Sequence, residues 1–301
     1  MNIKPILPFP CSEKLYKFIL RNRNKIFDED TMIVGILWGN VGCGKSVRAQ
    51  EFAYVINGNG KTELDMISFT KDEFVKSVLK YRKSCLIPDE GISIFFSRGA
   101  MTKEGRLMAE LMGQCRQKNN MLIICIPDIL SVDSLVLNMA NFIGYVWESR
   151  KVINDRFVTI KGNMRLYPHM RGMSYKNRII QYLRIKKSNP LIKMKMPQAW
   201  LTESGSPYGE GFKGGFYAVD EEQYKQKKES ILEKYRKQLE RKPRNKNIDF
   251  PTMDRLMANG MQLRKISAVL NVSYAVVKKR KREGFYRAFV ITKQRGRKHH
   301  K

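Results

Sequence analysis

The residues with the clearest chemical meaning are Gly39-Asn40-Val41-Gly42-Cys43-Gly44-Lys45-Ser46, which fit the phosphate-loop pattern G-x-x-x-x-G-K-[ST]. The glycines let the backbone turn tightly and direct its N–H groups at phosphate oxygens. Lys45 is expected to reach the β- and γ-phosphates of a nucleotide, and the Ser46 hydroxyl to bind Mg²⁺. The alternative is a glycine-rich turn without a ligand. The pattern favours a nucleotide site that runs from Gly39 through Val47.

Two adjacent acids, Asp89 and Glu90, follow an apolar segment about forty residues after this loop. Asp89, at the tip of a strand, is expected to hold Mg²⁺, and Glu90 to polarise the attacking water. The alternative is an ordinary acidic β-turn. A second carboxylate favours a nucleoside triphosphatase over a nucleotide kinase or a small GTPase. The two acids therefore predict ATP hydrolysis at this site.

Three arginines, Arg98, Arg106 and Arg116, lie between this acidic pair and the next apolar strand. An arginine can stabilise transition-state charge, either in its own chain or on the nucleotide of a neighbouring subunit. The alternative is a surface or DNA-contacting role, which is common in a chain this basic. We favour Arg116 for the catalytic role, followed by Arg98.

Strand and helix patterns alternate around these residues. Apolar runs at 32–38, 66–69, 84–88, 121–126 and 142–147 are predicted strands, and helices are expected after Lys45, through 70–81 and at 102–119. Ser12 is the expected N-cap of an earlier, basic helix that ends near Lys25. This alternation predicts an α/β fold with a mostly parallel sheet covered on both faces.

The segment 150–220 is basic and interspersed with aromatic residues, and it has two interpretations. It is either a nucleic-acid track or an extension of the sheet, with a hairpin predicted around Gly162-Asn163. From 219 to 242 the pattern becomes helical and highly charged. That helix either packs on the core or forms a connecting arm. We expect an ATPase domain over 1–240, made of a core at 30–150, this basic extension and the charged helix at 221–240.

The chain has 301 residues, 57 of them basic and 28 acidic, for a formal charge of +29. Such an excess predicts a polyanionic partner, with nucleic acid first and an acidic membrane surface second. The five cysteines show no pairing pattern and the three histidines no zinc pattern, which favours free thiols in a reducing compartment. No apolar stretch is long enough for a membrane span, and the start is unlike a signal peptide. The expected location is the cytoplasm, or the host cytoplasm for a viral protein.

A separate module is predicted at 250–285, after a polar linker at 241–249 and before a basic tail at 286–301. Three short helices with Ile266, Leu270 and Val277 turned inward resemble the helix-turn-helix of DNA-binding proteins. Residues 221–301 carry 24 basic and 8 acidic side chains, which favours phosphate contact over the alternative, a three-helix docking module. The expected DNA contacts are Arg264, Lys265, Ser273, Tyr274, Lys278, Lys279 and Arg280.

Residues 30–150 resemble the FtsK/HerA group of P-loop ATPases, and within it the Zot-like and archaeal or phage DNA-packaging and transfer branch. The resemblance rests on the phosphate loop, Asp89-Glu90, the Arg98 region and Cys115-Arg116-Gln117-Lys118-Asn119 before an apolar strand. It implies a RecA-like core, ring-shaped homo-oligomers with six subunits expected, and DNA pumping coupled to ATP hydrolysis. It also implies that Lys45 and Ser46 hold phosphate and Mg²⁺, Asp89 holds Mg²⁺ and Glu90 activates water.

The main hypothesis is therefore a DNA-stimulated ATPase of a virus or mobile element, which moves, packages or transfers double-stranded DNA. A helix-turn-helix would grip that DNA. The first alternative is a DNA-binding regulator or partition protein that ATP switches without translocation. A DNA-binding scaffold with an idle nucleotide site and a membrane-associated assembly ATPase are the other two.

Overall fold

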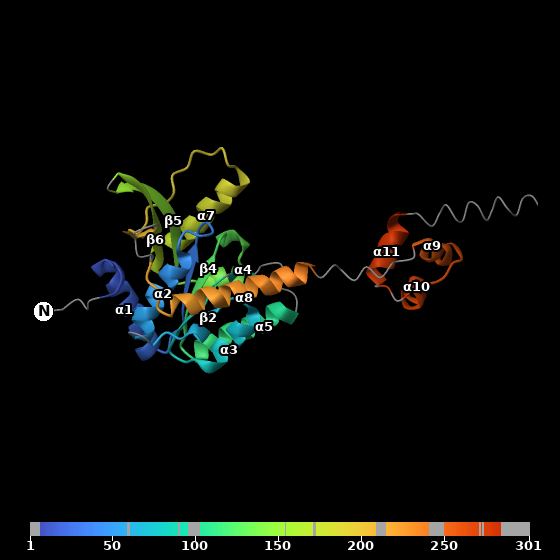
Figure 1. Ribbon diagram of the computed structural model, residues 1–301, viewed down its shortest axis with the longest axis horizontal. Helices are drawn as coiled ribbons and strands as arrows, with labels where there is room; N and C mark the ends of the chain where they lie inside the picture. Colours follow the sequence, from blue (N-terminus) through green and yellow to red (C-terminus); the bar gives the residue numbers. More distant parts are fainter. Residues whose placement is uncertain are drawn as a thin grey trace, which may run out of the picture. The chain divides into compact units, whose positions relative to one another are not determined.

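The computed structural model describes residues 7–58, 61–89, 91–95, 103–153, 155–170, 173–208, 215–240, 250–270, 272 and 274–283. The chain divides into two compact units, Met1–Ile231 and Leu232–Lys301. The long helix α8 (Glu221–Glu240) begins in the first unit and ends in the second (Figure 1). Among the described helices, none has both the length and the apolar character needed to cross a bilayer.

A mixed sheet forms the centre of the first unit, and its described strands follow the order β2-β3-β4-β1-β5-β6-β7, with β8 and β9 also paired to β6. The strands from β2 to β5 pair in parallel, as the alternation of strands and helices predicted. From β6 onward the pairing is antiparallel. The strand bounds are β1 (Ile33–Trp38), β2 (Ile67–Ser68), β3 (Cys85–Pro88), β4 (Met121–Ile126), β5 (Phe142–Ile153), β6 (Arg156–Met170), β7 (Met173–Ser174), β8 (Leu201–Glu203) and β9 (Ser206–Tyr208).

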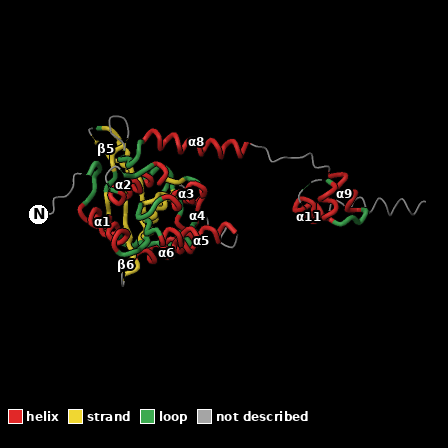
Figure 2. Tube along the Cα trace, turned by 90° about the horizontal axis from the view of Figure 1, so that it is seen from below, coloured by secondary structure: helices red, strands yellow, loops and turns green. Residues whose placement is uncertain are grey.

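Helices cover both faces of this sheet, so its central strands are apolar on both sides, as expected for parallel strands. One face packs on α1 (Glu13–Asp28), α2 (Lys45–Asn57) and the first half of α8. The other face packs on α3 (Lys71–Lys80), α4 (Gly91–Phe95), α5 (Lys103–Gln117), α6 (Ser134–Met139) and α7 (Tyr175–Ser188). Figure 2 shows the strands between α1 and the layer that holds α3 to α6. The first unit is therefore a three-layer α/β domain.

Local capping explains where two of the predicted helices begin. The Ser12 hydroxyl accepts a hydrogen bond from Leu15 N at 3.1 Å, and the Thr70 hydroxyl accepts one from Glu73 N at 3.3 Å. Both bonds satisfy an N–H group that has no partner within the helix. The helices start where these capping residues were predicted, while α1 runs to Asp28, three residues beyond the expected end near Lys25.

The hairpin predicted around Gly162-Asn163 is wrong, because the turn lies between Ile153 and Arg156, where β5 ends and β6 begins. Gly162 instead sits inside β6 with a φ of +79°. At this point two β6 residues, Lys161 and Gly162, oppose the single β5 residue Glu148. Gly162 therefore marks a β-bulge, which, like a tight turn, can require a residue with positive φ. The segment 156–208 contributes strands β6 to β9 to the sheet.

The second unit contains a three-helix cluster of α9 (Phe250–Ala258), α10 (Leu263–Val269) and α11 (Tyr274–Glu283). Met253, Met257, Ile266 and Val277 form its small core. The Arg280 guanidinium donates to both oxygens of the buried Asp254 carboxylate, at 3.0 and 2.6 Å. This bidentate pair joins α11 to α9, so Arg280, predicted as a DNA contact, holds the cluster together.

Candidate nucleotide site

The predicted phosphate loop lies between the carboxyl end of β1 and the start of α2. Gly42 and Gly44 have φ values of +80° and +98°, which L side chains rarely adopt. A Cβ at Gly39 would lie 1.9 Å from Val146 O, and one at Gly44 would lie 2.8 Å from Gly162 N. The glycines are therefore required both by the turn of the loop and by its close approach to β5 and β6.

Cys43 ties this loop to both of those strands. Its Sγ donates to Val146 O of β5 at 3.2 Å, and its carbonyl accepts from Gly162 N of β6 at 2.7 Å. The side chain is buried, and burial raises the pKa of the thiol. Cys43 is therefore a structural thiol that holds the loop in place.

Lys45 folds back over the loop that precedes it. Its Nζ donates to the carbonyls of Gly39 at 3.0 Å and Asn40 at 2.7 Å. An ammonium held above a turn of backbone N–H groups adds positive charge to an anion-binding concavity. The ammonium of Lys45 thus lies at the loop where the sequence predicts a phosphate contact.

Ser46 and Asp89, the two predicted Mg²⁺ ligands, are brought together. The Ser46 hydroxyl donates to Asp89 Oδ1 at 2.8 Å, although β4 lies between β1 and β3, the strands that precede the two residues. Asp89 follows β3 directly, and its own N–H donates to Ser68 O at 2.8 Å. A hydroxyl and a carboxylate are hard oxygen ligands, and Mg²⁺ commonly takes one or two such groups together with water and phosphate oxygens. The donor set therefore fits Mg²⁺.

Tyr224 of α8 completes the surroundings of this carboxylate, and the sequence did not indicate it as a site residue. Its hydroxyl donates to Asp89 Oδ2 at 2.5 Å. Burial and the charge of Asp89 raise the pKa of the Tyr224 phenol, so the group remains a protonated donor at neutral pH. Asp89 is 3% exposed, and each of its carboxylate oxygens accepts a hydrogen bond, Oδ1 from Ser46 and Oδ2 from Tyr224.

A cavity of about 300 Å³ opens above the loop. Residues of the loop, Ser46 and Asp89 line it, together with Tyr208, Gly215, Tyr217 and Tyr224. Four lysines also line it, from the loop, β6 and α8: Lys45, Lys161, Lys225 and Lys228. This volume lies at the lower end of the range for small-molecule pockets. Its positive lining suits a polyphosphate.

Arg48, on the first turn of α2, connects this helix to β6 and to the segment after β8. It is 2% exposed, and its Nε donates to Gly162 O at 2.6 Å. Its other nitrogens bind the Ser204 carbonyl and, at 2.6 Å, the Glu51 carboxylate. Burial raises the pKa of Glu51 to about 7 despite the nearby guanidinium. No sequence pattern indicated this buried pair, because charged residues in a helix are most often exposed.

Of the other arginines and acids predicted to be catalytic, Arg116 is the one whose side chain the structure describes. Glu90 and Arg98 are outside the described residues, as is the side chain of Arg106. Arg116 is exposed near the end of α5, just before β4 begins. The phosphate loop follows the opposite end of the parallel neighbour β1, about 20 Å away along the strands. The fold therefore does not bring Arg116 to Lys45 of the same chain.

The second unit presents most of the predicted DNA contacts at its surface. Arg264 and Lys265 on α10 are exposed, as are Tyr274, Lys278 and Lys279 on α11, while Ser273 is outside the described residues. Arg280 is engaged by Asp254 as described above.

Comparison with known proteins gives no match to a protein-family model and none to a curated protein. Several solved structures do match. The genome packaging NTPase B204 from Sulfolobus turreted icosahedral virus 2, in complex with sulfate, is 17% identical with a TM-score of 0.30, over 45% of this chain and 96% of that one. The N-terminal domain of zonular occludens toxin from Neisseria meningitidis is 12% identical with a TM-score of 0.28, over 46% and 84%.

A third match is a chain of the HORMA:CdnC:Trip13 complex of E. coli MS115-1, at 15% identity and a TM-score of 0.28. It covers 42% of this chain and 59% of that chain, which is less than two thirds of the length of the matched protein.

Proposed function

We propose that the first unit is a RecA-like ATPase domain that converts ATP and water to ADP and phosphate. The observation that carries this proposal is the 2.8 Å hydrogen bond between Ser46 and Asp89 at the floor of a lysine-lined cavity. It unites the end of the phosphate loop with an acid from a strand that is not adjacent to it. P-loop NTPases hold the Mg²⁺ of their nucleotide with a hydroxyl and a carboxylate placed in this way, whereas a glycine turn without a ligand requires neither group.

The residues have distinct roles in this reaction. The backbone N–H groups of the loop and Lys45 bind and orient the phosphates, while Ser46 and Asp89 hold Mg²⁺. When bound, Mg²⁺ neutralises charge on the phosphate oxygens. Tyr224 orients the Asp89 carboxylate through its hydrogen bond to Oδ2. We assign Glu90 to the polarisation of the attacking water. Arg116 and Arg98 are candidates for an arginine finger, and Arg116 would act on a neighbouring subunit of a homo-oligomeric ring.

The partner that we propose is double-stranded DNA, moved or packaged for a virus or mobile element. The support is electrostatic, since the chain carries a charge of +29 and its three-helix cluster exposes basic residues on α10 and α11. We propose that this cluster is a helix-turn-helix that contacts DNA through Arg264, Lys265, Ser273, Tyr274, Lys278 and Lys279. An ATP-switched DNA-binding regulator or partition protein is the alternative, because it would use the same two parts.

ATP turnover with and without double-stranded DNA tests the ATPase and its coupling. We expect turnover in the wild type, stimulation by DNA, and loss of turnover in Lys45→Ala and Glu90→Gln. Turnover that DNA leaves unchanged would discard translocation and favour the switched regulator. A wild type that neither binds nor cleaves ATP with Mg²⁺ would overturn the ATPase itself.

Deleting residues 249–301 tests the DNA-binding role of the second unit. Because its basic side chains would release counterions from DNA, the truncated chain should bind DNA more weakly and with a shallower dependence on salt. Binding is measured over a series of salt concentrations. An unchanged slope would assign the module to another task.

A further inference from the structure

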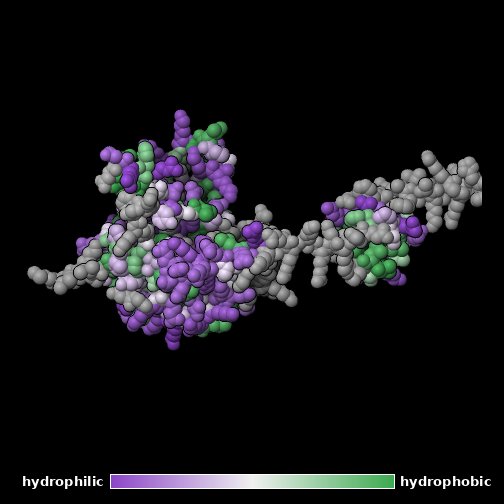
Figure 3. All heavy atoms as spheres, in the orientation of Figure 1, coloured by the Kyte–Doolittle hydropathy of each residue, from purple (hydrophilic) through white to green (hydrophobic). Residues whose placement is uncertain are grey.

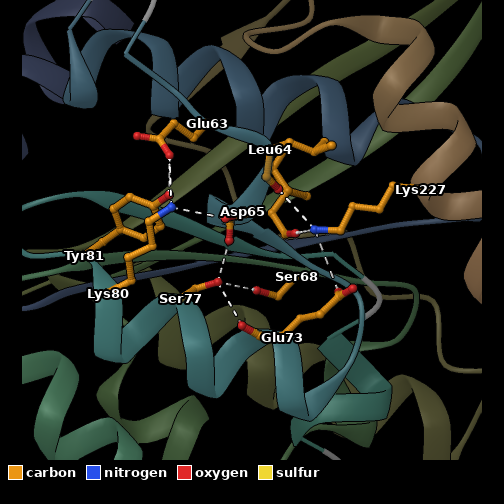
Figure 4. Close-up of polar contacts among 10 residues, drawn as sticks. Glu63, Leu64, Asp65, Ser68, Glu73, Ser77, Lys80, Tyr81 and Lys227 are labelled. Atoms are coloured by element: carbon orange, nitrogen blue, oxygen red, sulfur yellow. Dashed lines mark hydrogen bonds and ion pairs between the residues drawn. The ribbon is translucent and has the colours of Figure 1, made fainter.

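The first half of α8 is held firmly beside the nucleotide cavity, and Lys227 is its main anchor (Figure 4). Lys227 Nζ donates to the carbonyls of Leu64 at 3.1 Å and Ile67 at 2.6 Å, and it lies 4.0 Å from the Glu73 carboxylate. Burial lowers the pKa of this ammonium, as expected for a lysine that packs into the fold. Tyr224 and Ile231 on the same helix are also buried.

The next residue, Lys228, has a different environment. Its side chain is 33% exposed, against 18% for Lys227, and its Nζ lies 3.8 Å from Asp89 Oδ2. The other oxygen of that carboxylate accepts from Ser46. Lys228 also lines the cavity together with Lys45. Lys227 therefore anchors α8, whereas the ammonium of Lys228 lies at the proposed metal and phosphate site.

We propose that Lys228 binds the terminal phosphate of the nucleoside triphosphate. This inference rests on the ATPase function proposed above, in which Ser46 and Asp89 would hold Mg²⁺ and the metal would neutralise phosphate charge. The ammonium of a lysine sits on a flexible four-carbon stem, so a group 3.8 Å from Asp89 can reach an anion bound beside that carboxylate. Lys228 thereby supplies, from within the same chain, a positive charge near the phosphate that is transferred.

The position of α8 is held by contacts of residues other than Lys228. Lys227 makes two hydrogen bonds to backbone carbonyls, and the Tyr224 hydroxyl binds Asp89 at 2.5 Å. The outer surface of α8 is highly charged, and Figure 3 shows mainly hydrophilic residues on the visible face of the first unit. Among the α8 lysines whose side chains the structure describes, Lys225 pairs with Glu221 and Lys227 lies near Glu73, while Lys228 lies 3.8 Å from Asp89.

The test measures binding of ATPγS, ADP and AMP to the full chain with Mg²⁺ by titration calorimetry, in the wild type, Lys228→Gln and Lys228→Arg. A charge-assisted hydrogen bond to the terminal phosphate predicts that Lys228→Gln weakens ATPγS binding about 10-fold or more. AMP affinity should not change, and Lys228→Arg should keep most of the ATPγS affinity. The control is Lys17→Gln, which removes an equal charge from the exposed face of α1.

Each outcome decides the inference. A loss confined to the triphosphate supports it. An unchanged ATPγS affinity in Lys228→Gln, or an equal loss for all three nucleotides, overturns it, because the latter indicates a general disturbance of the cavity. Failure of the wild type to bind any nucleotide would overturn the ATPase proposal as well, and this result is distinct from a failure of Lys228 alone.

Discussion

The two sides of the nucleotide cavity are built in different ways. The phosphate-binding side comes from contiguous residues, Gly39 to Ser46, whose conformation follows from their own glycines. The rest of the lining includes residues of β6, β9 and α8, and long-range hydrogen bonds join these segments to α2 and to the end of β3. The bond of Arg48 to Gly162 spans 114 residues, and that of Tyr224 to Asp89 spans 135. We therefore expect the local motif to set what the cavity binds, and contacts between distant segments to hold the motif in place.

The largest effect is expected from Arg48→Ala, which breaks the distant side while leaving the motif unchanged. Removing the guanidinium leaves Glu51 buried without its ion pair and Gly162 O without its donor. Loss of one partner of a buried pair typically costs about 3–5 kcal/mol of unfolding free energy. Urea unfolding followed by tryptophan fluorescence measures this, because Trp38, Trp147 and Trp200 all lie in the first unit.

The double variant Arg48→Met with Glu51→Leu is the matched control for that measurement. Replacing both members of a buried ion pair by apolar groups is often close to neutral. The double variant should therefore recover much of the stability that Arg48→Ala loses. If Arg48→Ala lowers the free energy of unfolding by less than about 1 kcal/mol, the contacts of Arg48 with Gly162 and Glu51 do not stabilise the domain as expected.

A smaller effect, visible as a pH dependence, is expected from Glu51. Its pKa is raised from 4.5 to about 7 in the fold, so the folded chain binds more protons than the unfolded chain between these values. The free energy of unfolding should therefore fall as the pH rises from about 4.5 to 7. Glu51→Gln should remove this contribution, which comparison of the two urea-unfolding pH profiles will reveal. Parallel profiles would contradict the raised pKa.

The smallest effect is expected from Tyr224→Phe, which removes only the hydrogen bond to Asp89 Oδ2. Outer-shell partners of metal ligands typically contribute 10–100-fold to affinity, so Mg²⁺-dependent nucleotide binding should weaken about 10-fold. Tyr16→Phe on α1, outside the residues that line the cavity, is the control. Equal affinities for wild type and Tyr224→Phe would mean that α8 covers the site without orienting it.

The same contrast explains how much could be predicted from the sequence. The strands 33–38 and 121–126, the capped helices after Ser12 and Thr70, and the Ser46–Asp89 pairing follow from local patterns. The prediction of a hairpin turn at Gly162-Asn163 was wrong because a glycine of positive φ occurs in a turn and in a bulge alike, and only the pairing register distinguishes them. Arg48 and Tyr224 were missed because their roles depend on contacts with residues far away in sequence.

The bulge at Gly162 also connects β6 to the phosphate loop and to α2. Its N–H binds the Cys43 carbonyl of the phosphate loop and its C=O binds Arg48 of α2. About 17 Å farther along β6, at some 3.3 Å per residue, Phe157 is 85% exposed beside its β5 partner Val152. The β5–β6 hairpin is therefore hydrogen-bonded at its bulge to both the phosphate loop and α2, while its far end exposes the apolar side chains of Phe157 and Val152 to solvent.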